Sequence, residues 1–169
     1  TAQAIQQGLT QLYLKGTSSR LQPGDAILLV GDEREKTPGS ERWDARILQT
    51  VTENTEDGYT LVTWEQGLGH AHPTVAPADN PRVFAFRLRA ALFGHNAPDW
   101  RIMPSTVQQS FAPTDYLTRN QWPRFAIQDN RIDLDNAYAN VVAGGWVVLM
   151  KPSYVELYKA TSVVTSSRS

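Results

Sequence analysis

Two stretches near opposite ends of the chain share one pattern, and this internal match constrains the fold more than any other feature. The stretch Leu12 to Val30, LYLKGTSSRLQPGDAILLV, aligns without a gap on Ile132 to Met150, IDLDNAYANVVAGGWVVLM. Gly24 falls on Gly144, and each is followed by an apolar run. Glycine at that position allows a tight turn that reverses the chain before a strand. Each copy therefore predicts a strand, a turn and a second strand.

A third apolar segment follows each copy, ARILQTV after the first and ELYKATSV after the second. We therefore predict a duplicated three-strand β unit, the first copy in residues 1–66 and the second in residues 131–169, separated by an insertion in residues 67–130. The alternative is that any two hairpins with a glycine turn look alike. The two copies and the insertion together predict one compact domain.

Short β-branched or aromatic segments bounded by Gly, Pro, Asn or Asp recur along the whole chain, which favours an all-β barrel or sandwich. The insertion is mostly irregular, with one long strand predicted at residues 82–92 and a loop at residues 93–123. In that strand Phe84, Phe86 and Leu88 fall on one face, predicted to be core, and Val83 and Ala85 fall on the other with two arginines.

Helix signals are few. A fraying turn is predicted over residues 2–7, and a short helix is predicted over STVQQSF, where Ser105 and Gln108 have capping-box spacing. Pro113 ends that second helix because proline has no backbone N–H to continue it.

The composition removes several classes of function. The net charge is -1 from 16 basic and 17 acidic residues, so nothing favours capture of nucleic acid. There is no cysteine, which excludes disulfides and thiolate metal sites. The longest apolar run, Val141 to Met150, is about half of what a membrane span requires, so we expect a buried strand and no membrane insertion. No secretory signal opens the chain, and its first and last residues suggest a segment of a longer polypeptide.

The best metal candidate is the GHAHP segment. His70 and His72 project to the same side of an extended backbone, and His95 or Asp79 would be a third ligand. Nothing in the spacing demands that third ligand, and an exposed loop explains the segment equally well. We therefore predict no metal and no other cofactor.

Two carboxylate clusters are candidate catalytic pairs. Asp133 and Asp135 match a tyrosine and a lysine in the first copy, which favours a solvent-facing strand. Asp32, Glu33 and Glu35 are predicted to lie in a charged hairpin tip. A general acid and a general base need different pKa values, and a charged tip gives none of these carboxyl groups a reason for its pKa to shift. No nucleophile elbow or phosphate-binding loop is present, so we predict no enzymatic activity.

Aromatic residues on a β scaffold also suggest sugar binding. Trp100 and Trp122 lie in the insertion, each near a proline, where they either stack on a sugar or lock the loop down. Locking is the preferred interpretation. Arginine outnumbers lysine and gathers in the insertion, which favours protein partners.

The densest cluster of special residues is ALFGHNAPDWR, which we predict to be a structural corner that also contacts a partner. Phe93 would be the last buried residue, Gly94 would reverse the chain, and His95 and Asn96 would hydrogen-bond main-chain groups across the turn. Pro98 would fix its φ angle and Trp100 would pack the loop back. The candidate residues are Phe93, Gly94, His95, Asn96, Pro98, Asp99, Trp100 and Arg101, with Gly24 and Gly144 as turn glycines.

Four stretches of the chain carry a resemblance to a known family. In order, they are LYLKGTSSRLQPGDAILLVG, TLVTWEQGLG, RVFAFRLRAALFGHNAPDW and IDLDNAYANVVAGGWVVLMKPSYVELYKATSV. In these stretches the chain resembles the baseplate assembly proteins of phage tail-like contractile injection systems. These stretches cover well over half of it. The resemblance implies a structural component of the baseplate wedge, with wedge, spike or sheath proteins as partners. It implies location in a virion or tail-like particle assembled in the bacterial cytoplasm, and no catalytic residue or cofactor. The alternative is a carbohydrate-binding module associated with a tail or cell surface.

Overall fold

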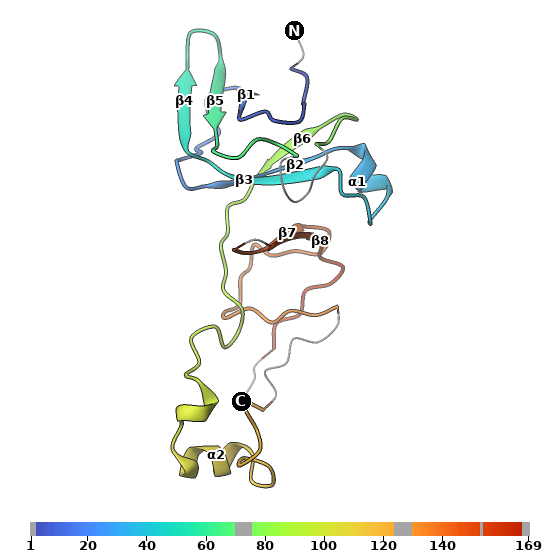
Figure 1. The fold of residues 1–169 in the computed structure, drawn as a ribbon. Coiled ribbons are helices and arrows are strands. Elements are labelled where there is room, and N and C mark those ends of the chain that lie inside the picture. Colours follow the sequence, from blue (N-terminus) through green and yellow to red (C-terminus); the bar gives the residue numbers. More distant parts are fainter. Residues whose placement is uncertain (1–2, 70–75, 124–129, 153, 167–169) are drawn as a thin grey trace. The chain divides into compact units, whose positions relative to one another are not determined.

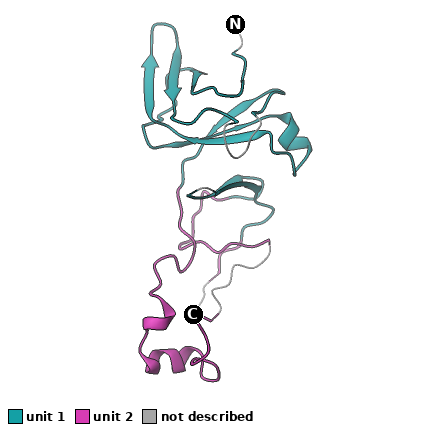
Figure 2. Ribbon diagram, viewed as in Figure 1, with its two compact units in different colours: residues 1–88, 142–163 teal, residues 89–141, 164–169 magenta. Residues whose placement is uncertain are grey.

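The computed structural model describes residues 3–69, 76–123, 130–152 and 154–166. The chain divides into two compact units, shown in different colours in Figure 2. Unit 1 holds residues 1–88 and 142–163, and unit 2 holds residues 89–141 and 164–169. The described part is mostly β-sheet, which confirms the all-β prediction at the level of fold class.

Unit 1 contains all the named strands, in three antiparallel sheets (Figure 1). The first sheet has the order β1-β5-β4, the second β3-β2-β6, and the third is the pair β7-β8. In the described residues these sheets do not close into a barrel. The strands are β1 Gln11–Lys15, β2 Ala26–Val30, β3 Trp43–Ile47, β4 Thr50–Asn54, β5 Tyr59–Thr63, β6 Arg82–Ala85, β7 Trp146–Lys151 and β8 Tyr154–Lys159.

Strand β2 is buried on both faces, as its unbroken apolar run predicts. Ile27 and Leu29 face what we call the first core, and Leu28 and Val30 face the second core. The first core joins the β1-β5-β4 sheet to the β3-β2-β6 sheet and consists of Leu12, Leu21, Ile27, Leu29, Leu48, Val62, Trp64, Leu68 and Ala76. The second core consists of Leu28, Val30, Trp43, Ala45 and Leu157.

The β2–β3 and β7–β8 hairpins begin with the same hydrogen bonds. The Gly24 N–H donates to the Leu48 carbonyl at 2.8 Å, and the Gly144 N–H donates to the Ala160 carbonyl at 2.7 Å. In the opposite direction, the Leu48 N–H donates to the Asp25 carbonyl at 2.8 Å, and the Ala160 N–H donates to the Gly145 carbonyl at 2.9 Å. Both turn glycines have positive φ, +92° and +81°.

The two hairpins also pack against each other through equivalent positions in the second core. When Gly24 is aligned with Gly144, Leu28 corresponds to Val148. The residues that pair across each hairpin then correspond as well, so Ala45 is equivalent to Leu157 and Trp43 is equivalent to Val155. All six side chains belong to the second core or pack on it, together with Val30, Phe86 and Trp146. The contact between the hairpins is therefore made by the same face of each.

The equivalence does not extend to the strand predicted at the start of each copy. β1 pairs with β5 rather than with β2, and its match in residues 132–134 makes one antiparallel bridge, from Leu134 to Leu92. The predicted continuous strand ARILQTV is also interrupted, because the chain passes at Leu48 and Gln49 from the second sheet to the first.

The long strand predicted at residues 82–92 ends at Ala85. Its partner β2 starts at Ala26, so after the bond from the Phe86 N–H to the Ala26 carbonyl no further partner is available. The core position predicted for Phe86 is confirmed, but the face of Val83 and Ala85, expected to be polar, also packs on a core. Val83 and Ala85 pack on the first core while Phe86 packs on the second, because β6 borders a strand that is buried on both sides.

The helix predicted over residues 2–7 is absent from the described residues 3–7. There the Gln3 side chain accepts from the Tyr13 N–H, and Gly8 donates to the Leu68 carbonyl. A segment this short gains little from an isolated helical turn. Tertiary hydrogen bonds therefore decide its conformation.

A helix that the sequence did not predict, α1 Asp32–Lys36, lies in the connection between β2 and β3. Its carboxylates hold the segment leading into β6. Glu33 accepts the N–H groups of Ala78 and Asp79 at 2.9 and 3.0 Å, and Glu35 pairs with Arg82 at 2.6 Å. Burial opposes ionisation of Glu33, but these backbone hydrogen bonds and Arg42 lower its pKa from 4.5. The acidic cluster thus has a structural role in the described chain.

Strand β3 carries an ion pair whose acidic member, Asp44, is fully buried, while Arg46 keeps part of its side chain exposed. Asp44 lies 2.6 Å from the Arg46 guanidinium and accepts the Gly69 N–H at 3.1 Å. Arg46 in turn donates to the carbonyls of Gln66 and Gly67. Desolvation raises the pKa of Asp44 from 3.8 to about 6, although Arg46 and the Gly69 hydrogen bond oppose the shift.

Candidate functional site

The predicted corner lies in unit 2, where two segments far apart in sequence are joined through their backbones. Residues 91–93 pair with residues 133–135 through the bridge between Leu92 and Leu134 and two flanking hydrogen bonds of 2.8 and 3.0 Å. The corner therefore starts from a fixed backbone position.

Gly94 makes the predicted reversal, with φ of +79°. The His95 N–H donates to the Leu92 carbonyl at 3.0 Å, and the Ala97 N–H donates to the Gly94 carbonyl at 2.9 Å. The side chains of His95 and Asn96 were expected to bond main-chain groups, but none of the hydrogen bonds within the described chain involves them. Positive φ at glycine closes this turn with backbone groups alone.

The next turn is the 3-10 helix η1 Trp100–Ile102, capped by Asp99. Its carboxylate accepts the Arg101 N–H at 2.9 Å and also forms an ion pair with the Arg101 guanidinium at 2.6 Å. The hydrogen bonds from Arg101 lower the pKa of Asp99 to about 2. Asp99 and Arg101 thus neutralise each other across the cap.

Trp100 is only 1% exposed and belongs to an aromatic cluster in which Trp122 contacts both other rings. Its ring meets Trp122 edge-on at 5.0 Å, and Trp122 meets Phe111 at 5.3 Å. The Trp122 indole donates to the Pro98 carbonyl at 2.6 Å, and Gln108 donates to the Trp100 carbonyl at 2.7 Å. This packing supports the preferred interpretation, in which the two tryptophans lock the loop. We call Trp100, Phe111 and Trp122 the aromatic lock.

The lock is covered by the predicted short helix, α2 Ser105–Phe111. Its N-cap is Pro104 and no side chain caps it, so the predicted capping box does not form. The helix has no buried residue. Around the lock, Ile102 is 76% exposed, Leu117 is 82% exposed, and Phe111 keeps more than half of its surface in solvent. We call Ile102, Phe111 and Leu117 the apolar surface of unit 2.

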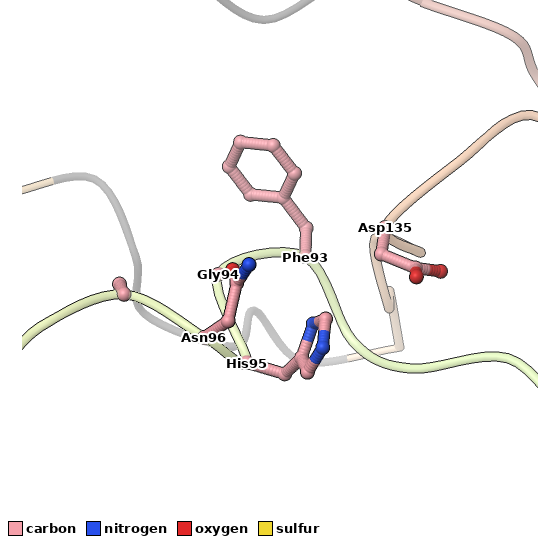
Figure 3. A pocket seen from close by; sticks show the side chains of 6 residues that line it. Phe93, Gly94, His95, Asn96 and Asp135 are labelled. Carbon is pink, nitrogen blue, oxygen red and sulfur yellow. The ribbon is translucent and has the colours of Figure 1, made fainter.

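A hollow of about 350 Å³ lies beside the turn, lined by Phe93, Gly94, His95, Asn96, Ala97 and Asp135. The Phe93 ring extends away from the His95 imidazole, and Asp135 reaches the hollow from the second segment (Figure 3). The Asp135 carboxylate accepts the Tyr138 hydroxyl at 2.8 Å. The arrangement offers hydrogen-bonding groups to a neighbouring molecule.

The remaining candidates do not converge on one site. Asp133 pairs with Arg131 at 3.0 Å, whereas Asp79 meets α1 through its backbone in unit 1. The histidine pair at residues 70 and 72 lies outside the described residues. Within the described chain, no group of three or more His, Asp or Glu side chains is placed to hold a metal ion, and no helix is long and apolar enough to cross a membrane.

Sequence reasoning missed one feature, on strand β8. Tyr154, Glu156 and Tyr158 alternate along the strand and so share one face of it. Both tyrosine hydroxyls donate to the Glu156 carboxylate, and the two tyrosines are 40% and 47% exposed. The alternation in YVELY groups these three side chains on one face, but it does not say whether that face is covered.

Comparison of the chain with protein-family models, curated proteins and solved structures found no match. The functional argument therefore depends on the geometry of the described residues and on the resemblance in the sequence.

Proposed function

We propose that this chain is a structural, non-enzymatic component of a phage tail-like contractile baseplate, where it binds other wedge, spike or sheath proteins. The resemblance at LYLKGTSSRLQPGDAILLVG and RVFAFRLRAALFGHNAPDW suggests the class of particle. The particle would be assembled in the bacterial cytoplasm. The contact residues are proposed from unit 2.

The observation that carries the proposal is the apolar surface of unit 2. Ile102 and Leu117 are more than three-quarters exposed. In sequence, Ile102 follows Trp100 in η1, and Leu117 lies between Phe111 and Trp122 of the aromatic lock. Large apolar side chains held exposed on a rigid base are characteristic of protein interfaces. The corner at residues 93–101 would dock with them, since its hollow presents hydrogen-bonding groups.

The test is co-purification of the protein from its native cells, analysed by mass spectrometry. Replacing both residues, Ile102→Asp and Leu117→Asp, should abolish recovery of wedge, spike and sheath proteins while leaving folding unchanged, because both side chains are exposed. Thr106→Asp, an exposed polar position on α2, is the matched control and should recover them all. Unchanged recovery with the double variant would disprove this contact surface. Absence of such proteins with the unaltered chain would disprove the baseplate role.

A second candidate is glycan binding, and the tyrosine face of β8 favours it. Tyr154 and Tyr158 present ring surface from one strand, and Glu156 between them orients both hydroxyls. Calorimetric titration with cell-surface glycans would show binding that Tyr158→Ala removes. Absence of heat with every glycan would exclude this function.

We also propose that the β2–β3 and β7–β8 hairpins are copies of one duplicated unit within a sandwich-like arrangement. The support is the pair of glycine turns with the same hydrogen bonds and the second core built from equivalent positions. Duplication explains why one face of each hairpin is complementary to the same face of the other, as in an isologous interface.

A further inference from the structure

The two hairpins differ at one edge. β2 has a strand on each side, β3 on one and β6 on the other. Among the described residues β7 pairs with β8 alone, so its other edge corresponds to the edge of β2 that β6 occupies. An unpaired edge presents a row of N–H and C=O groups ready to bind another strand.

The first hairpin shows what fills such an edge in this fold. β6 lies antiparallel to β2 with Ile27 opposite Ala85 and Val30 opposite Arg82. It is secured by the carboxylates of α1, which bind the segment that leads into it. In the second hairpin β7 ends at Lys151 and β8 begins at Tyr154, which leaves no room for a helix such as α1.

The face of the second hairpin that points away from the second core is also less covered. Ile27 and Leu29 of β2 are fully buried in the first core, beneath the β1-β5-β4 sheet. Their equivalents Val147 and Leu149 are only half-buried, and the opposite residue Tyr158 is nearly half exposed. The second hairpin therefore has a less covered face beside an edge that no described residue pairs with.

We propose that β7 binds an extended segment of a different protein, which adds as an antiparallel strand opposite residues 147–150. The inference depends on the proposed equivalence of the two hairpins and not on the baseplate role. The partner segment would resemble β6, which places Phe84 opposite Leu28. It would carry an apolar side chain opposite Val148 and small or apolar side chains opposite Val147 and Leu149. Main-chain hydrogen bonds supply affinity in this mode of recognition, and alternate side chains supply specificity.

The β6 strand of this chain is not available to fill the edge of β7, because it is already paired with β2. β6 pairs with β2 over residues 82–85 and contributes Val83 and Ala85 to the first core. Removing it to fill the edge of β7 would expose fully buried Ile27 and Leu29. A separate segment satisfies β7 without that cost.

A synthetic peptide with the sequence PRVFAFRL, residues 81–88, is a suitable probe because it contains the strand that fills the equivalent edge. Hydrogen exchange of the whole chain, resolved by residue, should show less protection in β7 than in β2. Adding the peptide should protect residues 147–150 and leave β4 unchanged. The same peptide with Phe84→Pro should not protect them, because proline lacks the N–H and is excluded from paired strand positions.

Variants of the chain locate the binding edge. Val147→Lys changes a half-buried position on the face of β7 that points away from the second core. This variant should no longer be protected from hydrogen exchange at residues 147–150 when PRVFAFRL is added. Thr52→Lys on β4, which is also an edge strand, is the matched control and should leave this protection intact.

Three outcomes would overturn the proposal. Equal protection of β2 and β7 in the monomeric chain would mean that the edge is already filled from within. Protection at residues 27–30, or nowhere, when the peptide is added would mean that β7 does not accept a strand of this kind. Concentration-dependent protection of β7 without peptide would identify a second copy of the chain as the occupant.

Discussion

The β2–β3 and β7–β8 hairpins share a backbone arrangement but have different surroundings. Both begin at a glycine with positive φ and close with the same pair of hydrogen bonds. The first is bordered by β6 and covered by the β1-β5-β4 sheet, so four residues of β2 are fully buried. The second presents half-buried valines and exposed tyrosines. Burial is thus decided by what covers a hairpin, while its turn and register are local.

The connection between the strands explains much of that difference. In the first hairpin the connection contains α1, whose acidic side chains hold the approach to β6. In the second, β7 ends at Lys151 and β8 begins at Tyr154, too close in sequence for such a helix. An insertion between two strands can therefore determine whether the sheet gains a third.

The largest expected effect is at the centre of β2. Leu28→Ala should lower the free energy of unfolding by about 4 kcal/mol, because a fully buried leucine leaves a cavity. Val148→Ala at the equivalent, half-buried position should cost about 1 kcal/mol. Urea denaturation of both variants measures the difference. Equal losses would mean that the two hairpins are equally covered.

The second effect is on the pH dependence of the free energy of unfolding. It is tested at Asp44 and, as a comparison, at Glu156, the equivalent residue of β8. The folded pKa of Asp44 is about 6 against 3.8 for the unfolded chain, so the folded state binds more protons between these values. Its contribution to stability should therefore fall by about 2 kcal/mol as pH rises from 4 to above 6.

Urea denaturation across that pH range tests the contribution of Asp44. The Asp44→Asn variant should lose this slope, whereas Glu156→Gln should retain it. Glu33 acts in a separate range, because its lowered pKa makes its contribution disappear only as pH falls below 4.5. A slope that survives in Asp44→Asn would assign the pH dependence to other groups.

The third effect concerns the contact between α1 and the segment leading into β6. Glu33→Ala should lower stability by about 1.5 kcal/mol, since two N–H groups lose a charged acceptor. It should also increase hydrogen exchange in β6, which makes the edge of β2 resemble that of β7. Lys36→Ala removes an exposed ion pair on the same helix and should change stability by less than about 0.5 kcal/mol. Unaltered exchange in β6 would show that α1 does not hold that strand.

The smallest expected effects test whether the two turns are equivalent. Gly24→Ala and Gly144→Ala should each cost about 1 kcal/mol, because φ is positive at both and a methyl group would meet no atom within 4 Å. Gly39→Ala, where φ is not positive and space is also open, should be nearly neutral. Thermal unfolding measures all three. Markedly unequal costs at the two turns would argue against duplication.

The corner at residues 93–101 was identified from its sequence, and so was the locking role of Trp100 and Trp122. The reversal at Gly94 and the burial of Trp100 agree with that prediction, whereas Phe93, expected to be the last buried residue, is 40% exposed. The hydrogen bonds expected of His95 and Asn96 failed because backbone groups already close the turn. The β8 tyrosine face was missed because alternation alone does not say which side of a strand remains uncovered.

The sequence by itself determined the β character of the chain, the two glycine turns and the apolar runs that follow them. These are local properties, set by which φ values a residue tolerates and which side chains suit a strand. Only the tertiary structure decided that β1 pairs with β5, that β6 stops at Ala85, and that α1 forms between β2 and β3. Strand pairing and its extent depend on partners distant in sequence, and a strand continues only as far as its neighbour does.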